Sequence, residues 1–304
     1  MSPPRVSLVV IAHNMARELP RTLQSLSPAY QRDIGADDYE VIVVDNGSAQ
    51  PLDRQQLLDL CPNAAIHTMT DAPPSPVAAI NHGLALARGD LVGVLIDGAR
   101  MASPRLVATA LEASGLHVRP VIGTIAFHLG PDVQMRSVSR GYNQQVEDAL
   151  LDSVDWVADG YQLFSISAFA GSSAQGWFTV PSETNALFLG RDHWRDLGGY
   201  DPAFVAPGGG LVNLDTWARA CADPAVHVIL LLGEATFHQV HGGIATNAPT
   251  SRWTEFHDEY VRIRGMPYAR PTKAALLLGR IPPQALPSLR DSIEKGAAPL
   301  AGKT

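Results

Sequence analysis

Polar side chains that could bind a ligand stand at the ends of three apolar runs in the first hundred residues. They are His13 and Asn14 after the first run, Asp45 and Asn46 after the second, and Asp97 after the third. A carboxylate at the end of a buried strand must be solvated, paired or bound to a metal. The sequence therefore raises the question of what Asp97 holds. Arg100 is the cation nearest to it along the chain.

Helical patterns alternate with the apolar runs through the first 115 residues. Short buried strands are expected at 6–12, 39–45, 64–69 and 90–97, and helices at 14–26, 52–60, 76–89 and 103–114. Ser103 is expected to cap the last of these helices, with Pro104 at its first position. Alternating strands and helices predict an α/β fold, with a mostly parallel sheet that binds ligands at the carboxyl ends of its strands. We therefore expect the polar residues to form one rim, which is the predicted site.

The second half of the sequence is less regular. Strands are expected at 118–129, at the start of 183–200 and at 225–233, and helices at 141–154, at the end of 183–200, at 211–222 and at 251–265. Residues 159–180 indicate a mobile loop or cover, and 237–243 a loop. We expect a main domain at 1–265, made of two halves at about 1–115 and about 116–265, then a helical C-terminal extension at 266–304.

The composition is that of a globular protein, with 46% apolar residues, 17% charged residues and a net charge of −7. A negative charge without a Lys/Arg-rich run argues against nucleic-acid binding. Cys61 and Cys221 match no metal-binding spacing and are expected to be free thiols in a reducing compartment. No secretory signal is recognisable, and no apolar run reaches the ~20 residues that span a bilayer. We expect a soluble, cytoplasmic protein, with any membrane association peripheral.

The order of five motifs is more specific than any one of them. They are "VSLVVIAHN", "VIVVDNGS", "NHGLALARGD", the strand that ends in Asp97, and "LGGYDPAF" near residue 200. Over residues 5–245 this series resembles the family 2 glycosyltransferases, nucleotide-sugar enzymes of the Rossmann-like GT-A fold. The resemblance implies a sugar-nucleotide donor, a divalent metal and transfer to a hydroxyl or amine. It also implies that the half at about 1–115 binds the nucleotide and that the half at about 116–265 binds the acceptor. It also implies a donor site made of Ala12, His13, Asn14, Asp45, Asn81, Asp97 and Arg100, with Asp45 on the base, expected to be uracil.

The resemblance also implies a late histidine that completes the metal site. His241, or otherwise His238, stands at that place after the strand 225–233. Asp97 would then be shared between ribose and metal, and diphosphate oxygens and water would complete the coordination. Imidazole with carboxylate suits Mn²⁺, whereas Mg²⁺ prefers oxygen ligands.

Two acidic motifs of the family are half present. Ala99 stands where the second Asp of Asp-x-Asp is usual, and Asn213 stands where the base is usual. Because an amide cannot take a proton at neutral pH, Asp215 becomes the first candidate for the catalytic base and Glu183 the second. A late helix start, with Asn213 as N-cap, would bring Asp215 into the first turn, where it could instead complement the helix N-terminus. Trp177 and residues 181–187 are expected to face the acceptor.

Three functions remain open from the sequence. The first is a metal-dependent glycosyltransferase that moves a sugar from a UDP-sugar to a hydroxyl acceptor in polysaccharide or glycoconjugate assembly. The second is a non-catalytic relative that binds nucleotide-sugar or glycan, which the missing acids motivate. The third is a sugar nucleotidyltransferase, against which the lack of a Gly-rich, Arg/Lys-bearing loop after the first strand counts.

Overall fold

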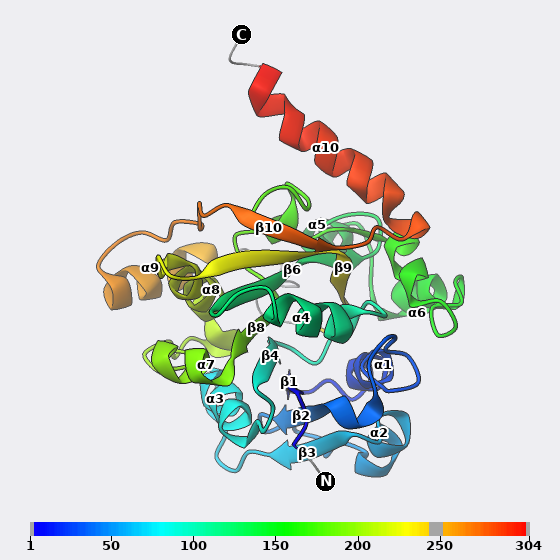
Figure 1. Cartoon of the computed structure of the whole chain (residues 1–304). Coiled ribbons are helices and arrows are strands. Elements are labelled where there is room, and N and C mark those ends of the chain that lie inside the picture. The colour runs from blue at the N-terminus through cyan, green and yellow to red at the C-terminus, as the bar shows by residue number, and fades with distance from the viewer. Residues whose placement is uncertain (1–2, 243–251, 302–304) are drawn as a thin grey trace.

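A computed structural model describes residues 3–242 and 252–301, in which helices cover both faces of a ten-stranded sheet (Figure 1). The strand order is β10-β9-β6-β8-β4-β1-β2-β3, with β5 paired to β9 and β7 to β6. The strands are β1 (Val6–Ala12), β2 (Tyr39–Asp45), β3 (Ala64–Thr68), β4 (Leu91–Leu95), β5 (Arg100–Ala102), β6 (Pro120–Leu129), β7 (Ser167–Phe169), β8 (Ala186–Gly190), β9 (His227–His238) and β10 (Ala275–Gly279). The α-helices are α1 (Glu18–Ser25), α2 (Arg54–Leu60), α3 (Val77–Leu86), α4 (Leu106–Ser114), α5 (Gln134–Ser139), α6 (Gln144–Asp152), α7 (Arg191–Leu197), α8 (Val212–Ala222), α9 (Trp253–Arg264) and α10 (Leu286–Ala301). Short 3₁₀ helices lie at Ala36–Asp38, Gly160–Ile166, Gly171–Ser173, Pro207–Gly209 and Pro283–Ala285.

The strands of the first half form the predicted parallel sheet. β1 pairs in parallel with β2 and β4, and β2 pairs with β3. In this register Ala12 lies beside Asp45, so the carboxyl ends of the two strands coincide. β4 ends at Leu95, two residues before Asp97. The carboxyl ends of β1, β2 and β4 therefore lie at the same edge of the sheet, as the sequence predicted.

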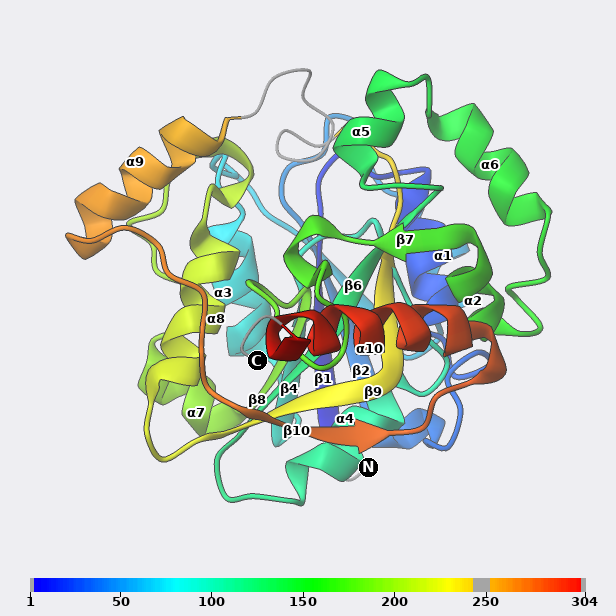
Figure 2. The same ribbon diagram turned by 90° about the horizontal axis from the view of Figure 1, so that it is seen from above.

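An apolar cluster covers each face of the sheet. Leu19 of α1 and Leu106 of α4 belong to one cluster, and Ile80 of α3 and Trp217 of α8 belong to the other. Figure 2 shows the same division, with α3, α7 and α8 on one side of the sheet and α1 and α2 on the other. Full burial of these side chains on both faces explains why the central strands are almost continuously apolar.

The C-terminal half differs from expectation at several elements. Residues 266–304 were expected to be loose helices, but Ala275–Gly279 form β10, which extends the sheet beside β9. A loop was expected at 237–243, but β9 continues to His238, so the loop begins only at Gln239. Gly243 lies outside the described residues. The three-residue strand β5 was also missed. β10 pairs in parallel with β9, and β5 pairs with it in antiparallel orientation. Local sequence patterns do not predict such pairings between distant segments.

Three further local expectations are wrong. Ser103 does not cap α4, because its Oγ donates to Glu234 Oε2 (2.6 Å) and accepts from a β9 backbone amide. Residues 159–180 are not a loose loop, since they contain two 3₁₀ helices and β7 and bury Trp177 completely. Asn213 is not an N-cap, because α8 begins at Val212.

Cys61 and Cys221 are both buried and unpaired, as expected for free thiols. Burial raises the pKa of each thiol to about 12. Among the residues described, the helices are all too short or too polar to cross a bilayer.

The buried carboxylate of Glu234 generates a prediction about stability. Burial raises its pKa from 4.5 to about 7, so the folded state binds this proton more tightly than the unfolded state. The resulting stabilisation is complete below pH ~4.5 and is lost as the pH rises through ~7. It amounts to about 3 kcal/mol. Between these pH values, the free energy of unfolding of the parent should fall by about this amount relative to Glu234→Gln, as measured by urea denaturation.

Glu294→Gln is the matched control, because Glu294 is exposed and has no ion pair in the described part of the chain. Its free energy of unfolding should follow that of the parent at every pH. Parallel curves for the Glu234→Gln variant and the parent would contradict the prediction.

Candidate functional site

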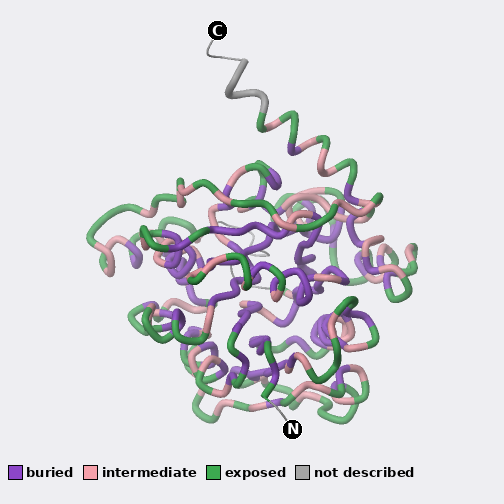
Figure 3. Tube along the Cα trace, viewed as in Figure 1, coloured by how far each residue is buried: buried purple, intermediate pink, exposed green. Residues whose placement is uncertain are grey.

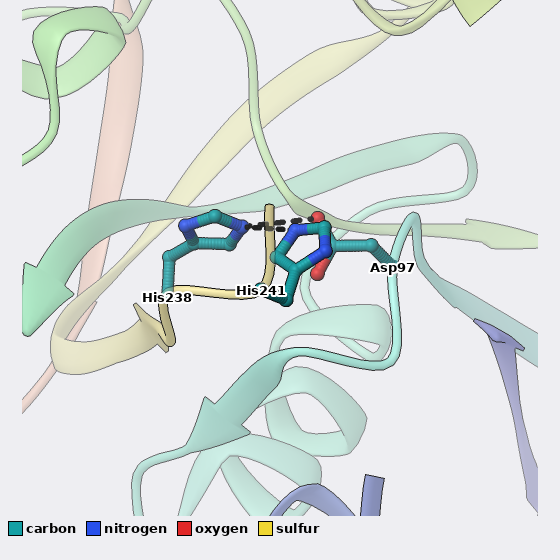
Figure 4. A group of neighbouring side chains, drawn as sticks. All are labelled: Asp97, His238 and His241. Carbon is teal, nitrogen blue, oxygen red and sulfur yellow. Dashed lines mark hydrogen bonds and ion pairs between the residues drawn. The ribbon is translucent and has the colours of Figure 1, made fainter. Parts of the chain in front are cut away.

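Asp97, His238 and His241 form a cluster whose ligand atoms all lie within 4.8 Å of one another (Figure 4). The two Nε2 atoms of the histidines are 3.2 Å apart, and His238 Nε2 is 3.7 Å from Asp97 Oδ2. One carboxylate and two imidazoles directed at one point are ligands that Mn²⁺ accepts. The structure thus brings Asp97 together with both histidines that the sequence offered as alternatives.

Backbone pairing brings the members of this cluster together. β5 runs antiparallel to the end of β9, with Arg100 opposite His238. The backbone amide of Gln239 continues the pairing by donating to the Ala99 carbonyl at 2.8 Å. The strand ladder therefore bridges the 141 residues between Asp97 and His238.

The segment that carries His241 is anchored to two helices. The Val240 amide donates to Glu147 of α6 at 2.8 Å, and Arg17, just before α1, donates to the Val240 carbonyl at 3.3 Å. The Gln239 side chain donates to the Glu18 carbonyl at 3.1 Å. These contacts fix the backbone on both sides of Val240, so His241 is held against His238.

Gln134 of α5 determines which nitrogen of His238 faces the cluster. Its Nε2 donates to the His238 carbonyl at 2.9 Å, and a carbonyl can only accept, so this bond fixes the orientation of the amide. Its Oε1, 2.7 Å from His238 Nδ1, must then accept a proton from that nitrogen. A neutral His238 protonated at Nδ1 has a bare Nε2, which is the nitrogen directed at Asp97 and His241.

Both histidines of the cluster are neutral at neutral pH. Burial, reinforced by the Arg100 charge, lowers the pKa of His238 well below 6.5. Burial also lowers the pKa of His241, although Asp97 opposes the shift. A neutral imidazole is the form that binds a metal.

Arg100 gives the site a fixed positive charge. Its Nε donates to Asp97 Oδ2 at 2.9 Å, and its residue is only 6% exposed. Its Nη1 is buried and has no hydrogen-bond partner in the described structure. A buried guanidinium N–H without an acceptor is suited to a phosphate oxygen of a bound ligand. Ala99, at the place of the usual second Asp, is fully buried and supplies only its backbone amide to Asp97 Oδ1.

The nucleotide-side residues lie together at the ends of β1 and β2. Asp45 Oδ1 accepts from both the amide and the hydroxyl of Ser48, at 3.0 and 2.6 Å. The same hydroxyl lies 2.8 Å from the amide of Asn14, which has a left-handed backbone with φ of 53°. His13 Nδ1 is 2.9 Å from a carbonyl of the turn after β2, and Ala12 is buried. The sequence "DNGS" is consistent with an Asx-type turn after the strand, but Ser48 itself was not singled out.

Asn81 is not brought to this rim by any hydrogen bond among the described residues. Its amide binds both the backbone N–H and the carbonyl of Tyr200, at 2.9 and 2.8 Å. It therefore holds the turn after α7, which is a structural use of the side chain.

The two base candidates have different surroundings. The Glu183 carboxylate accepts from Asn213 Nδ2 at 2.8 Å. Burial raises its pKa, although the hydrogen bond from Asn213 and the charge of Arg100 oppose this shift, and the charge of Asp97 adds to it. Asp215 is 1% exposed, and both of its oxygens are held by guanidinium groups.

The partners of Asp215 are Arg219 at 2.7 Å and Arg264 at 2.6 and 2.7 Å. Because both carboxylate oxygens already accept hydrogen bonds from guanidinium groups, Asp215 is poorly placed to contact an acceptor hydroxyl. The structure therefore supports the structural interpretation of Asp215. Trp177, expected at the acceptor, instead packs in the core against Phe127, Phe164 and Phe169.

Residues 7–155 match the family model described as "Glycosyl transferase family 2". The structure resembles S. aureus TarS 1–349 in complex with UDP-GlcNAc, with a TM-score of 0.56 and 14% identity over 85% of this chain and 65% of that one. For TarS 1–349 without a named ligand, the TM-score is 0.51 and the sequence identity 13%, and the match covers 96% of this chain and 80% of that one. For a longer TarS chain, the TM-score is 0.50 and the sequence identity 15%, and the match covers 78% of this chain and 37% of that one. This chain thus spans less than two fifths of the longer TarS chain. No curated protein matches the sequence. These similarities show the GT-A fold.

The hydrogen bonds of Gln134 generate a prediction for metal binding. Gln134→Met keeps the side-chain length but removes the acceptor for His238 Nδ1–H, so the imidazole loses its fixed tautomer. We expect the affinity of the protein for Mn²⁺ to fall by about 10- to 100-fold. Isothermal titration would measure it, and long-range ¹⁵N–¹H spectra would show His238 changing from the Nδ1–H form to a mixture. An unchanged tautomer in the folded variant would contradict the argument.

Proposed function

We propose that this chain, whose residues 7–155 match glycosyl transferase family 2, transfers a sugar from a UDP-sugar to a hydroxyl group of a glycan or glycoconjugate acceptor. The observation that carries the proposal is the placement of the Asp97–His238–His241 cluster and of Asp45 at the carboxyl ends of β4, β9 and β2, which belong to one sheet. In such sheets this edge is where nucleotides bind. The complexes of TarS with UDP and UDP-GlcNAc make UDP the first ligand to test.

The residues of the cluster fit a divalent cation, and Mn²⁺ better than Mg²⁺. Asp97, His238 and His241 would hold it, since they supply one oxygen and two nitrogens, and the Gln134 contact presents a bare His238 nitrogen. A metal bound there would neutralise charge on the departing diphosphate. Arg100 supports the same task, because its free Nη1 can donate to a phosphate oxygen.

Glu183 is the better-supported base for transfer. Asn213 occupies the place where the family usually has the base, and it donates to the Glu183 carboxylate. It therefore orients a neighbouring acid. A raised pKa brings a carboxylate closer to the operating pH of a general base. In an inverting reaction Glu183 would take the proton of the acceptor hydroxyl as the hydroxyl oxygen attacks the anomeric carbon.

A non-catalytic relative that binds nucleotide-sugar is the second candidate. Ala99 and Asn213 at usually acidic positions favour it. Release of UDP from a panel of UDP-sugars, with and without Mn²⁺ and a glycan acceptor, separates the two, because only the transferase releases UDP in step with acceptor modification.

The first prediction for this function concerns the base. Glu183→Gln should keep donor affinity but lower the rate of transfer by about 100-fold or more, because the amide cannot take a proton. The parent's rate should rise with pH through the raised pKa of Glu183, and the residual rate of the variant should lack this rise. UDP release and calorimetric UDP binding provide the two measurements.

Asp215→Asn serves as the comparison, because it should mainly lower stability. Loss of a buried charge that pairs with two arginines costs about 3–5 kcal/mol, while the rate per folded molecule stays near that of the parent. The proposed base would be contradicted if Glu183→Gln transferred sugar at the rate of the parent. If proton NMR also showed that the product retains the anomeric configuration of the donor, a retaining mechanism would explain the reaction instead.

The second prediction concerns the donor site. Asp97→Ala and His241→Ala should abolish the Mn²⁺-dependent part of UDP binding, since each removes a ligand. Asp45→Ala should weaken uridine binding without metal, because its contact is to the base. Calorimetry with UDP–Mn²⁺ and with uridine alone measures both effects. If all three variants bind as the parent does, the site is elsewhere.

A further inference from the structure

Charge is distributed very unevenly along the chain. Residues 262–304 contain eight of the 23 Lys and Arg residues, including all three lysines, but two of the 30 Asp and Glu residues. Their net charge is +6, whereas residues 1–261 carry −13. The overall charge of −7 thus hides a basic C-terminal segment, which we define for its described side chains as residues 262–295.

The cations of this segment are mostly uncompensated. Fourteen of the fifteen arginines before residue 262 lie within 4.0 Å of a carboxylate, Arg54 being the exception. In the C-terminal segment, only Arg264 and Lys295 are paired in this way. No carboxylate partner exists in the described structure for Arg262, Arg270, Lys273, Arg280 and Arg290, and the residues outside it contain no Asp or Glu.

The same segment exposes large apolar side chains. They are Met266, Leu276, Leu277, Leu286 and Ile293, between 39% and 61% exposed. A cleft of about 510 Å³ adjoins them and combines both kinds of group, since Phe178 and Leu277 line it together with Arg270 and Lys273. Exposed apolar side chains gathered in one segment and bordered by polar groups are typical of an interaction surface.

The segment occupies one margin of the molecule. Figure 1 shows β10 along the upper edge of the sheet and α10 projecting beyond it, and Figure 3 shows the exposed residues along both. β10 is an end strand of the sheet, with only β9 beside it. On α10, Leu286, Arg290 and Ile293 are spaced to share one exposed face, while Ser292 packs against the body near Trp177.

We propose that residues 262–295 form a docking surface for an anionic lipid bilayer. The uncompensated cations would lie at the lipid headgroups, and Leu286 and Ile293 would enter the boundary with the acyl chains. A second copy of the chain is a poorer occupant, because its matching surface carries the same positive charge. An anionic membrane supplies the opposite charge and an apolar layer at once, and the negative charge of residues 1–261 orients the other faces of the protein away from it.

The test is co-sedimentation of the full chain with vesicles of phosphatidylcholine and phosphatidylglycerol, mixed about two to one, and with pure phosphatidylcholine vesicles. The parent should bind the anionic vesicles at about 0.05 M salt and lose most of this binding at about 0.5 M salt. The triple variant Arg262→Gln, Arg280→Gln and Arg290→Gln should bind about 100-fold more weakly. These side chains have no partner in the described structure, so their loss should leave folding intact.

A matched control changes the net charge equally on other surfaces. Arg136→Gln, Arg140→Gln and Arg195→Gln remove three exposed, paired cations and should change vesicle binding by less than about threefold. Leu286→Ser with Ile293→Ser tests the apolar part and should weaken binding at least about tenfold.

Absence of parental binding to anionic vesicles at low salt would overturn the proposal, as would equal losses in the control and the surface triple variant. A salt-resistant dimer in analytical ultracentrifugation, dissociated by the Leu286/Ile293 substitutions and unable to bind vesicles, would assign the surface to a second copy instead. Binding is measured without a sugar donor, so each outcome is independent of the proposed transfer reaction.

Discussion

The antiparallel pairing of β5 with the end of β9 is the contact on which the site depends. Three residue pairs and two further backbone hydrogen bonds, from Gln239 to Ala99 and from Ser103 to Ala235, join the segment after Asp97 to β9 and its extension. Ser103, directly after β5, adds the buried hydrogen bond to Glu234. Without this short ladder, Asp97 would be a carboxylate at a strand end with only Arg100 beside it. With it, the carboxylate faces two imidazoles whose protonation is controlled by burial and by Gln134.

The two missing acids have different physical consequences. Ala99 leaves the cluster with a single carboxylate, and the two histidines make up the number of ligand atoms without adding charge. Arg100 then pairs with the remaining carboxylate, so the charges of the cluster residues and Arg100 are close to balanced. Asn213, in contrast, cannot take a proton, but its side-chain amide donates a hydrogen bond to the Glu183 carboxylate.

The sequence predicted the first half of the fold well because its signals are local. Buried strands such as β1 and β2 are mostly apolar runs, and the polar residues of the rim stand where they end, with His13 directly after β1 and Asp45 as the last residue of β2. The pairing of Asp97 with a distant histidine was predicted through resemblance. Gln134 was missed because its importance lies in a contact across 104 residues. Asp215 was favoured by its motif, and its pairing with Arg264 across 49 residues cannot be read from spacing. β10 was missed because five apolar residues between Pro-rich stretches look alike as strand or helix.

The two buried cysteines have a practical consequence. A thiol with a pKa of about 12 is almost wholly protonated at neutral pH, and only the thiolate reacts with alkylating reagents. Cys61 and Cys221 are also shielded from solvent, so we expect the native protein to react very slowly with maleimides. A single cysteine introduced on an exposed face can therefore carry a fluorophore or spin label selectively, with both natural cysteines left in place to fill the core.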